Sequence, residues 1–435
     1  MIAPTWHHGG VGSSGEAASP DFTPDQTRSD SEPPRSTVAT LADRWDIRPD
    51  HTWLRGQRPE HTVRFDEDGS VNIYGYPEAV KVLTNPQIFS NDVGRLFLDE
   101  GVDLDEKVQE GSLLQSDPPA HGKLRKLVSR AFTPKTIADL EPRIVALTRE
   151  LLDQAGDQGT LELVGALTYP LPVIVICELL GVPASDRDLF KKWVDRMEQS
   201  ASALLDDEVD DENVDVAAAN RYVPEMHEYL AAQVAERRRN PKDDLLTSLV
   251  QAEVDGDRLT DAQVLNFANE LLVVGHATTS ALLGNLVLCL DAYPETAARV
   301  RADRSLVPGA VEESLRFLSP VAAIYRATTK EFELDGHHVD ADRLVRVWVG
   351  AANRDPRQFT DPETFDPARD PNPHIGFSHG IHFCLGAPLA RLESIIALNM
   401  LLDRYPELSI DPADPPTFMA LPDAIGVATL PLRTG

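Results

Sequence analysis

Cysteine is scarce in this sequence, and the placement of the few cysteines argues against a disulfide-based fold. Cys177, Cys289 and Cys384 are the only cysteines among 435 residues, and they lie far apart. An odd number at such spacing fits a reducing compartment better than a disulfide framework. Cys177 and Cys289 lie in apolar runs, as buried free cysteines usually do. Cys384 lies among glycines and histidines, a setting that core packing does not explain.

Basic residues are also in short supply. The chain has 41 Lys and Arg against 70 Asp and Glu, which gives a formal net charge of −29 at pH 7. Phosphate backbones and anionic lipid surfaces attract basic faces, so this balance argues against a general nucleic-acid binder and against docking on anionic lipid. We therefore expect no nucleic-acid partner and no membrane partner.

Long uninterrupted apolar runs are missing as well. The N-terminal residues have neither the basic region nor the apolar core of a signal peptide. The most apolar stretches are residues 161–183, interrupted by Pro170 and Glu178, and residues 271–290, which contain His276. A bilayer span needs about 20 consecutive apolar residues, and neither stretch supplies them. We expect a cytoplasmic protein.

Hydrophobic residues nevertheless make up 42% of the chain, enough for a large core. Residues 1–36, rich in Gly, Ser, Pro and Asp, predict a disordered tail, and residues 37–435 predict one domain. The fold class is mostly α with small β-sheets at both ends, including a hairpin over residues 61–74. A final helix is expected over residues 385–402. Helix-start signals occur near Pro118, Pro142, Tyr169, Ser185, Val216, Asp243, Thr260, Pro294 and Pro308.

The first candidate site is the segment Phe-Ser-His-Gly-Ile-His-Phe-Cys-Leu-Gly at residues 377–386. A glycine-rich turn leads directly into a helix, which places Cys384 at the helix N-terminus. Backbone N–H groups and the helix dipole favour an anionic sulfur there. Gly380 and Gly386 carry no side chain and so allow another group to approach the backbone closely. This pattern suits a thiolate ligand to a large flat cofactor.

The second candidate site is the apolar helix around residues 271–280. The Thr278 hydroxyl lies one turn after Val274, where it can bond the Val274 carbonyl and bend the helix. Gly275, between them, would let a planar ligand or O₂ approach the backbone.

Two further pairs share helix faces. His121 and Arg125 are four residues apart at the start of a helix and together suit one anionic group. Glu313 and Arg316 are three residues apart, the spacing of a helical ion pair.

These motifs, in this order, resemble those of the cytochrome P450 family, and the resemblance runs from about residue 50 to the C-terminus. It implies a single large domain with haem b (iron protoporphyrin IX) buried between the central and final long helices. By the resemblance, Cys384 is the axial thiolate to iron. Phe377 packs beneath the ring near the sulfur. The resemblance also assigns contacts with the haem propionates to His121, Arg125, Arg326 and His382.

The resemblance also implies roles around the haem. Glu313 and Arg316 are structural and lock with a later arginine, which we expect to be Arg354. Thr278 aligns with the threonine that helps to protonate iron-bound oxygen. Ala277 departs from the family pattern, because it stands where an acidic residue is usual and cannot relay a proton. Val274 replaces a smaller residue and narrows the space above the iron.

The function implied is a haem-thiolate monooxygenase that inserts one oxygen atom from O₂ into a lipophilic substrate, by hydroxylation or epoxidation, in secondary metabolism. The chain has no flavin, iron–sulfur or nicotinamide motif, so a ferredoxin and a ferredoxin reductase are implied as partners. Because of Ala277, atypical proton delivery stays open: a peroxide-driven reaction, a substrate-assisted one, or radical coupling. A catalytically silent recruitment scaffold is the remaining alternative, against which Cys384 and Thr278 argue.

Two surfaces complete the expected site. An acid-free basic helix is predicted to dock an acidic ferredoxin through Lys123, Lys126 and Arg130. Apolar residues from four segments are expected to contact the substrate, namely Val93, Leu96, Phe97, Val274, Val321, Ala322, Ile324 and Ile425.

Overall fold

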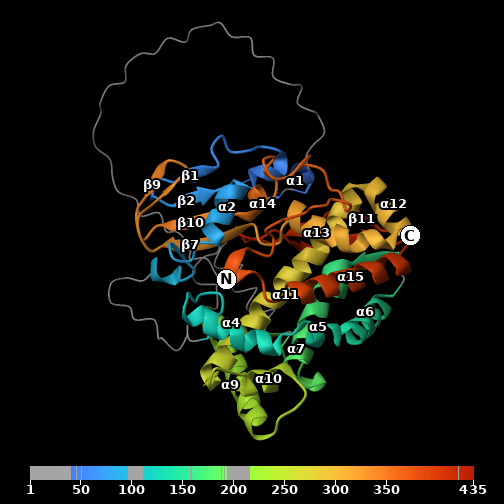
Figure 1. Ribbon diagram of the computed structural model, residues 1–435. Helices are drawn as coiled ribbons and strands as arrows, with labels where there is room; N and C mark the ends of the chain where they lie inside the picture. Colours follow the sequence, from blue (N-terminus) through green and yellow to red (C-terminus); the bar gives the residue numbers. More distant parts are fainter. Residues whose placement is uncertain are drawn as a thin grey trace.

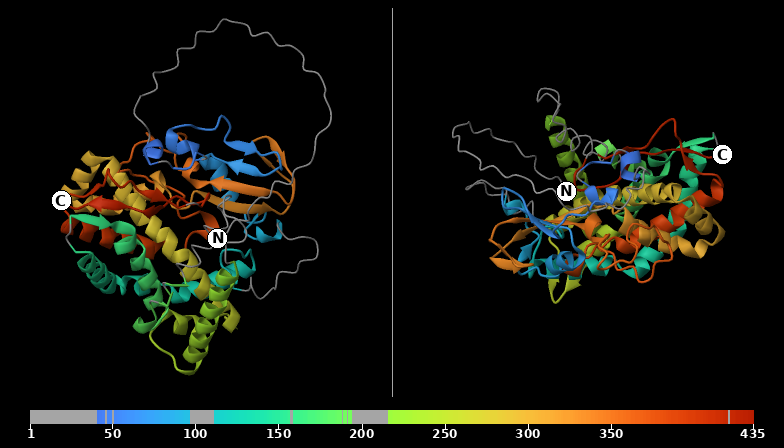
Figure 2. Two further views of the ribbon diagram at one scale, coloured as in Figure 1. Left: turned by 180° about the vertical axis from the view of Figure 1, so that it is seen from behind. Right: turned by 90° about the horizontal axis from the view of Figure 1, so that it is seen from above.

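The computed structural model describes residues 41–45, 47–49, 51–96, 111–156, 159–187, 189–190, 192–193, 216–419 and 421–435. The expected tail at residues 1–36 and the substrate residue Phe97 lie outside these ranges. A β-rich part lies on one side and a larger helical part on the other (Figure 1). The same division is visible from behind and from above (Figure 2).

Helices account for most of the described chain. The α-helices are α1 (Leu41–Arg44), α2 (Tyr76–Leu83), α4 (Ala120–Ala131), α5 (Pro134–Ala138), α6 (Glu141–Ala155), α7 (Pro170–Leu179), α9 (Val216–Arg239), α10 (Leu245–Gln251), α11 (Asp261–Ala292), α12 (Pro294–Ala302), α13 (Val307–Phe317), α14 (Val349–Ala352) and α15 (Ala387–Arg404). The short helical turns are η1 (Thr52–Arg55), η2 (Gly94–Leu96), η3 (Val164–Thr168), η4 (Ala184–Asp186), η5 (Arg304–Leu306) and η6 (Gly380–His382).

The sheets are small. The largest has the strand order β1-β2-β10-β7-β3, formed by β1 (Val63–Phe65), β2 (Val71–Ile73), β10 (Leu344–Trp348), β7 (Ala323–Thr328) and β3 (Phe89–Ser90). A three-stranded sheet contains β11 (Ser409–Ile410), β14 (Pro431–Arg433) and β4 (Thr160–Glu162). Three two-stranded pairs are β12 (Thr417–Phe418) with β13 (Val427–Thr429), β5 (Glu253–Val254) with β6 (Asp257–Arg258), and β8 (Phe332–Leu334) with β9 (His337–Val339).

Helix α11 is the centre of the helical part, and its start follows from the sequence. The Thr260 side chain accepts the N–H of Gln263, and the Gln263 side chain accepts the N–H of Thr260, which together form a capping box. Helices α7, α9, α13 and α15 pack against α11. Among the described residues, α11 is the one helix long and apolar enough to cross a membrane, yet 67% of its most apolar window is buried in the protein. It is therefore a core helix.

The predicted element boundaries agree closely with the structure. The hairpin over residues 61–74 is the antiparallel pair β1–β2, with Val63 opposite Ile73. Proline lies in the first turn of α6, α12 and α13, where the fixed φ and the missing N–H cost a helix nothing. Near Ser185 the chain forms the short turn η4, and the described residues 187, 189–190 and 192–193 that follow it are helical.

The predicted pair of Glu313 and Arg316 is the most buried ion pair of the described chain, since both side chains have no exposed surface. Arg316 donates from Nε to Oε2 of Glu313 at 2.9 Å and from Nη2 to Oε1 at 2.7 Å. The expected third arginine was wrong. Arg369, not Arg354, reaches Glu313, at 3.1 Å from Nε to Oε1. Arg354 instead donates to the carbonyl of Phe317 and pairs with a different glutamate.

Glu313 also accepts the backbone N–H of Asp366 at 3.0 Å and the side-chain amide of Asn372 at 3.0 Å. One carboxylate on α13 therefore fixes the irregular chain between α14 and the cysteine segment.

We predict that Glu313→Gln destabilises the protein by about 3–5 kcal/mol, because it leaves the buried charge of Arg316 uncompensated. The measurement is chemical unfolding of the purified protein followed by circular dichroism. Asp139→Asn is the matched control, since it breaks the exposed pair of Lys135 and Asp139 and should leave the unfolding midpoint unchanged. Equal midpoints for Glu313→Gln and the control would contradict the structural role of Glu313.

Candidate active site

Cys384 lies in the turn that leads into α15, and backbone N–H groups converge on its sulfur. Its own N–H donates to the carbonyl of Phe377 at 2.9 Å, which closes the loop. Burial raises the pKa of the Cys384 thiol, while the N–H groups of Gly386 and Ala387 and the charge of Arg125 act in the opposite direction. The expected placement of the sulfur at a helix N-terminus is confirmed. For the free thiol burial outweighs these donors, whereas a metal bound at the sulfur would itself stabilise the anionic form.

The backbone of this loop explains two of its small residues. Gly380 has φ of +74°, and a Cβ there would lie 2.7 Å from the carbonyl oxygen of Leu83 at the end of α2. Ser378 adopts φ of +64°, a left-handed conformation that residues other than glycine rarely occupy. A Cβ at Gly386 would meet only the Cys384 sulfur, at 3.9 Å, so the space beside the sulfur is open on that side.

Basic side chains from three segments converge next to this loop. His121 of α4 and His382 of η6 have ring centroids 4.1 Å apart. Arg125, one turn after His121, donates to the carbonyl of Phe383 at 2.8 Å. Burial, together with the charges of His121, Arg326 and Arg125, lowers the pKa of His382 to about 3. Burial also lowers the pKa of Arg326, on β7, to about 10.

Two histidines of this basic cluster have a buried ring nitrogen without a hydrogen-bond partner in the described part of the chain. The Nε2 atoms of His121 and His382 are buried and have no hydrogen-bond partner there. Buried donors of this kind are costly unless a partner is present. Two carboxylates of a haem placed beside Cys384 would supply that partner. The residues present therefore fit the propionate contacts that the sequence predicts.

The central helix shows the predicted threonine bond. The Thr278 hydroxyl donates to the carbonyl of Val274 at 3.0 Å, and Thr279 makes the same bond to Gly275. The expectation for Gly275 itself needs correction. A Cβ at Gly275 would lie 2.7 Å from Cδ1 of Ile176, so its missing side chain makes room for helix α7.

The segments expected to surround the substrate come together in part. Val321 pairs with Ala424 in an isolated β-bridge. This bridge places the residues just before β7 against the C-terminal turn. Asn285 of α11 donates its side-chain amide to the carbonyls of Ile425 and Leu318, at 2.8 and 2.9 Å. One polar side chain thus ties α11 to the C-terminal turn and to the end of α13.

The individual side chains differ in exposure. Ala322 and Ile425 are fully buried, whereas Val93, Leu96 and Ile324 are partly exposed. Ile324 and Arg326 are two residues apart on β7 and so share one face of the strand, and Ala322 lies just before its first residue.

Two acidic residues that sequence reasoning passed over lie close to the site. Glu270 of α11 accepts the Ser112 hydroxyl at 2.7 Å and the Leu114 N–H at 3.2 Å, and burial raises its pKa to about 7. It ties the segment before α4 to the central helix. Glu312 of α13 binds Arg391 of α15. Nothing in the sequence distinguishes these two acids from the many surface ones, apart from the apolar surroundings of Glu270.

Fold and site together define a haem-thiolate protein. The family model for Cytochrome P450 matches residues 52–434. Cyclomarin C epoxidase CymV of Salinispora arenicola is 42% identical over 362 residues, covering 83% of this chain and 90% of that protein. Erythromycin C-12 hydroxylase of Saccharopolyspora erythraea is 41% identical over 367 residues, covering 83% and 88%. The crystal structure of HmtT, involved in himastatin biosynthesis, is 57% identical with a TM-score of 0.83, covering 91% of this chain and 100% of that one.

The chain belongs to the cytochrome P450 family. It is accordingly a P450 monooxygenase whose cofactor is haem, with the mostly α fold that the sequence predicted.

We predict that Arg326→Met weakens haem retention about tenfold to a hundredfold, since a charged hydrogen bond contributes about 1.5–3 kcal/mol. The measurement is the rate of haem transfer to an acceptor protein. The Soret band of the reduced CO complex should keep its position, because the thiolate is untouched. Arg343→Met, at a more exposed site near the same sheet, is the control and should leave haem transfer unchanged. Equal transfer rates for the two variants would remove Arg326 from the propionate site.

Proposed function

We propose that this monooxygenase inserts one oxygen atom from O₂ into a medium to large lipophilic secondary metabolite, by hydroxylation or epoxidation. The observation that carries the proposal is the Cys384 sulfur, held at the N-terminus of α15 beside a basic cluster in which two buried histidine nitrogens have no hydrogen-bond partner among the described residues. The names of the relatives support the reaction type, since one is an epoxidase and another a hydroxylase.

In this proposal each residue has one task. Cys384 ligates the iron, and haem, when bound, supplies the oxygen-activating chemistry. The propionates are held by His121, Arg125, Arg326 and His382. Thr278 presents its hydroxyl to the oxygen side of the site. Because that hydroxyl already donates its hydrogen to the Val274 carbonyl, its Oγ1 is left as an acceptor that can hold a proton-donating water or substrate group in place.

The substrate side is assigned to apolar residues. Val274 and Ala277 of α11, with Val321, Ala322, Ile324 and Ile425, would form apolar walls that exclude water from the reacting atoms. Val93, Leu96 and Phe97 would approach from the segment between β3 and α4. These assignments favour a lipophilic substrate, and the named relatives in secondary metabolism agree with that class.

Atypical proton delivery is the second candidate, and Ala277 is the observation that favours it. An alanine side chain has no proton to give. A peroxide-driven or substrate-assisted reaction would not need an acid at this position, and radical coupling would insert no oxygen at all.

We expect a single ¹⁸O atom in the product when the holoenzyme turns over under ¹⁸O₂ with ferredoxin, ferredoxin reductase and a nicotinamide reductant. Mass spectrometry of the product measures the label. Cys384→Ala should abolish both the label and the red-shifted Soret band of the reduced CO complex. Label that enters only from H₂¹⁸O₂ would favour the peroxide-driven reaction, and an oxidised product without label would sink monooxygenation.

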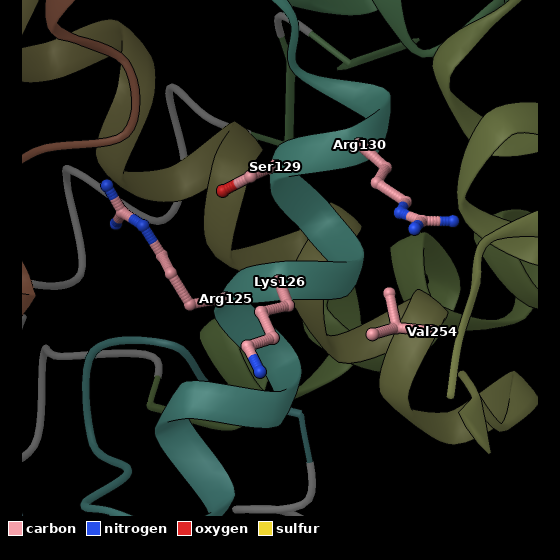
Figure 3. Close-up of a pocket in the computed structure, with 5 residues that line it drawn as sticks. All are labelled: Arg125, Lys126, Ser129, Arg130 and Val254. Atoms are coloured by element: carbon pink, nitrogen blue, oxygen red, sulfur yellow. The ribbon is translucent and has the colours of Figure 1, made fainter. Parts of the chain in front are cut away.

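We further propose that electrons come from an acidic ferredoxin that docks beside α4, in the cytoplasm. An open surface pocket of about 440 Å³ is lined by Arg125, Lys126, Ser129, Arg130 and Val254. In Figure 3, Arg125 and Arg130 project to opposite sides of α4, with Lys126 between them.

Two basic residues of α4 at or beside this pocket also have partners within the protein. Lys123 pairs with Asp257, and Arg130 donates to the backbone carbonyl of Glu253. The nearby hydrophobic side chains Ile381 and Phe383 are 39% and 40% exposed, which adds apolar contact area close to Cys384. A basic rim around an apolar centre is typical of a docking face for an acidic partner.

Lys126→Glu is predicted to slow reduction by ferredoxin several-fold at low salt, because it reverses the charge that steers the acidic partner. Stopped-flow reduction of the holoenzyme measures the rate, and the difference should shrink as ionic strength rises. Lys330→Glu, an exposed site between β7 and β8, serves as the control and should reduce at the unaltered rate. Equal slowing by both variants would count against this docking face.

A further inference from the structure

Glu312 lies next to Glu313 on α13 but binds different partners. Arg391 of α15 donates from Nε to Oε1 at 2.6 Å and from Nη2 to Oε2 at 2.8 Å, a bidentate pair. His374, in the chain just before the cysteine loop, contributes a third contact, 3.0 Å from Nε2 to Oε2. Burial alone would raise the pKa of Glu312, but the hydrogen bonds from Arg391 and His374 lower it to about 2.

The orientation of the His374 ring follows from its second contact. The backbone N–H of Gly376 donates to Nδ1 of His374 at 3.2 Å. Nε2, on the opposite side of the ring, then faces Glu312 as the donor. The permanent charges of the cluster are one cation, Arg391, and one anion, Glu312.

Arg391 connects this cluster with the cysteine. Its guanidinium carbon lies 4.6 Å from the centroid of the Phe377 ring, a cation–π arrangement. The carbonyl of Phe377 accepts the N–H of Cys384. The Phe377 ring and carbonyl thus place the guanidinium of Arg391 directly behind the cysteine loop.

We propose that Glu312 and Arg391 are positioning residues that set the reduction potential of the haem–thiolate unit, Arg391 by its positive charge behind the cysteine loop and Glu312 by partly cancelling that charge. The proposal rests on the proposed function of Cys384 as the iron ligand. Reduction adds one electron to the unit, so nearby positive charge makes the potential more positive. Glu312 keeps the potential lower than Arg391 alone would set it.

The test is an equilibrium reductive titration of the substrate-free holoenzyme with mediators. Glu312→Gln leaves Arg391 uncancelled and should shift the potential to a more positive value. Arg391→Gln leaves Glu312 uncancelled and should shift it to a more negative value. The double variant should lie close to the parent protein, because both charges are gone.

These opposite signs separate charge from structure. Each single variant breaks the same bidentate pair, so a purely structural role would shift both potentials in the same direction, and that result would overturn the proposal. Because both side chains are about one-third exposed, the shifts should be larger at low salt.

A matched control pair joins α15 to α6. Arg404→Gln and Asp153→Asn break the pair of Arg404 and Asp153 near the far end of α15 and should leave the potential unchanged. The red-shifted Soret band of the reduced CO complex is recorded for every variant. Loss of that band in the parent protein would defeat the proposed function, whereas a retained band with unchanged potentials would defeat only this inference.

Discussion

The buried carboxylate of Glu313 is the constraint on which the candidate site depends. A carboxylate without exposed surface is tolerated only when every oxygen has partners, and here Arg316, Arg369, Asn372 and a backbone N–H supply them. Most of these partners lie in the irregular chain that follows α14. That chain leads directly into the cysteine loop, so one charge in α13 determines where the sulfur lies. The ion pair therefore contributes more to holding this chain in one arrangement than to the net free energy of folding.

Glu312 and Glu313 show how one helix can serve two purposes. Successive residues of an α-helix point about 100° apart, so adjacent glutamates face different segments. Glu313 faces the buried chain after α14, and Glu312 faces α15 beside the cysteine loop. The first pair is fully buried and the second about one-third exposed. The buried pair is therefore suited to fixing geometry, and the exposed pair to adjusting the electrostatic field, which remains sensitive to solvent and salt.

Much of the fold could be predicted from sequence signals that act over a few neighbouring residues. Prolines and caps at helix starts act within one turn, so the starts of α6, α11 and α12 could be predicted. Contacts between residues that are distant in sequence could not be predicted in this way. The arginine that meets Glu313 was predicted as Arg354 but is Arg369, because the choice depends on how the intervening chain folds back. Gly275 was predicted to face a ligand, yet its missing side chain accommodates Ile176 of a neighbouring helix.

The acid missing at Ala277 constrains how protons reach the site. Glu270, two turns earlier on α11, is a half-buried acid of that helix, and at about 10 Å along the helix axis it is too far for direct transfer. Its oxygens accept hydrogen bonds from the Ser112 hydroxyl and the Leu114 N–H, so Glu270 holds the segment before α4 in place. The hydroxyls of Thr278 and Thr279 in this part of α11 both donate their hydrogens to backbone carbonyls one turn back. Under the proposed function, a proton would therefore arrive through water or from the substrate, and the rate of turnover would depend on how the substrate fills the space beside Thr278.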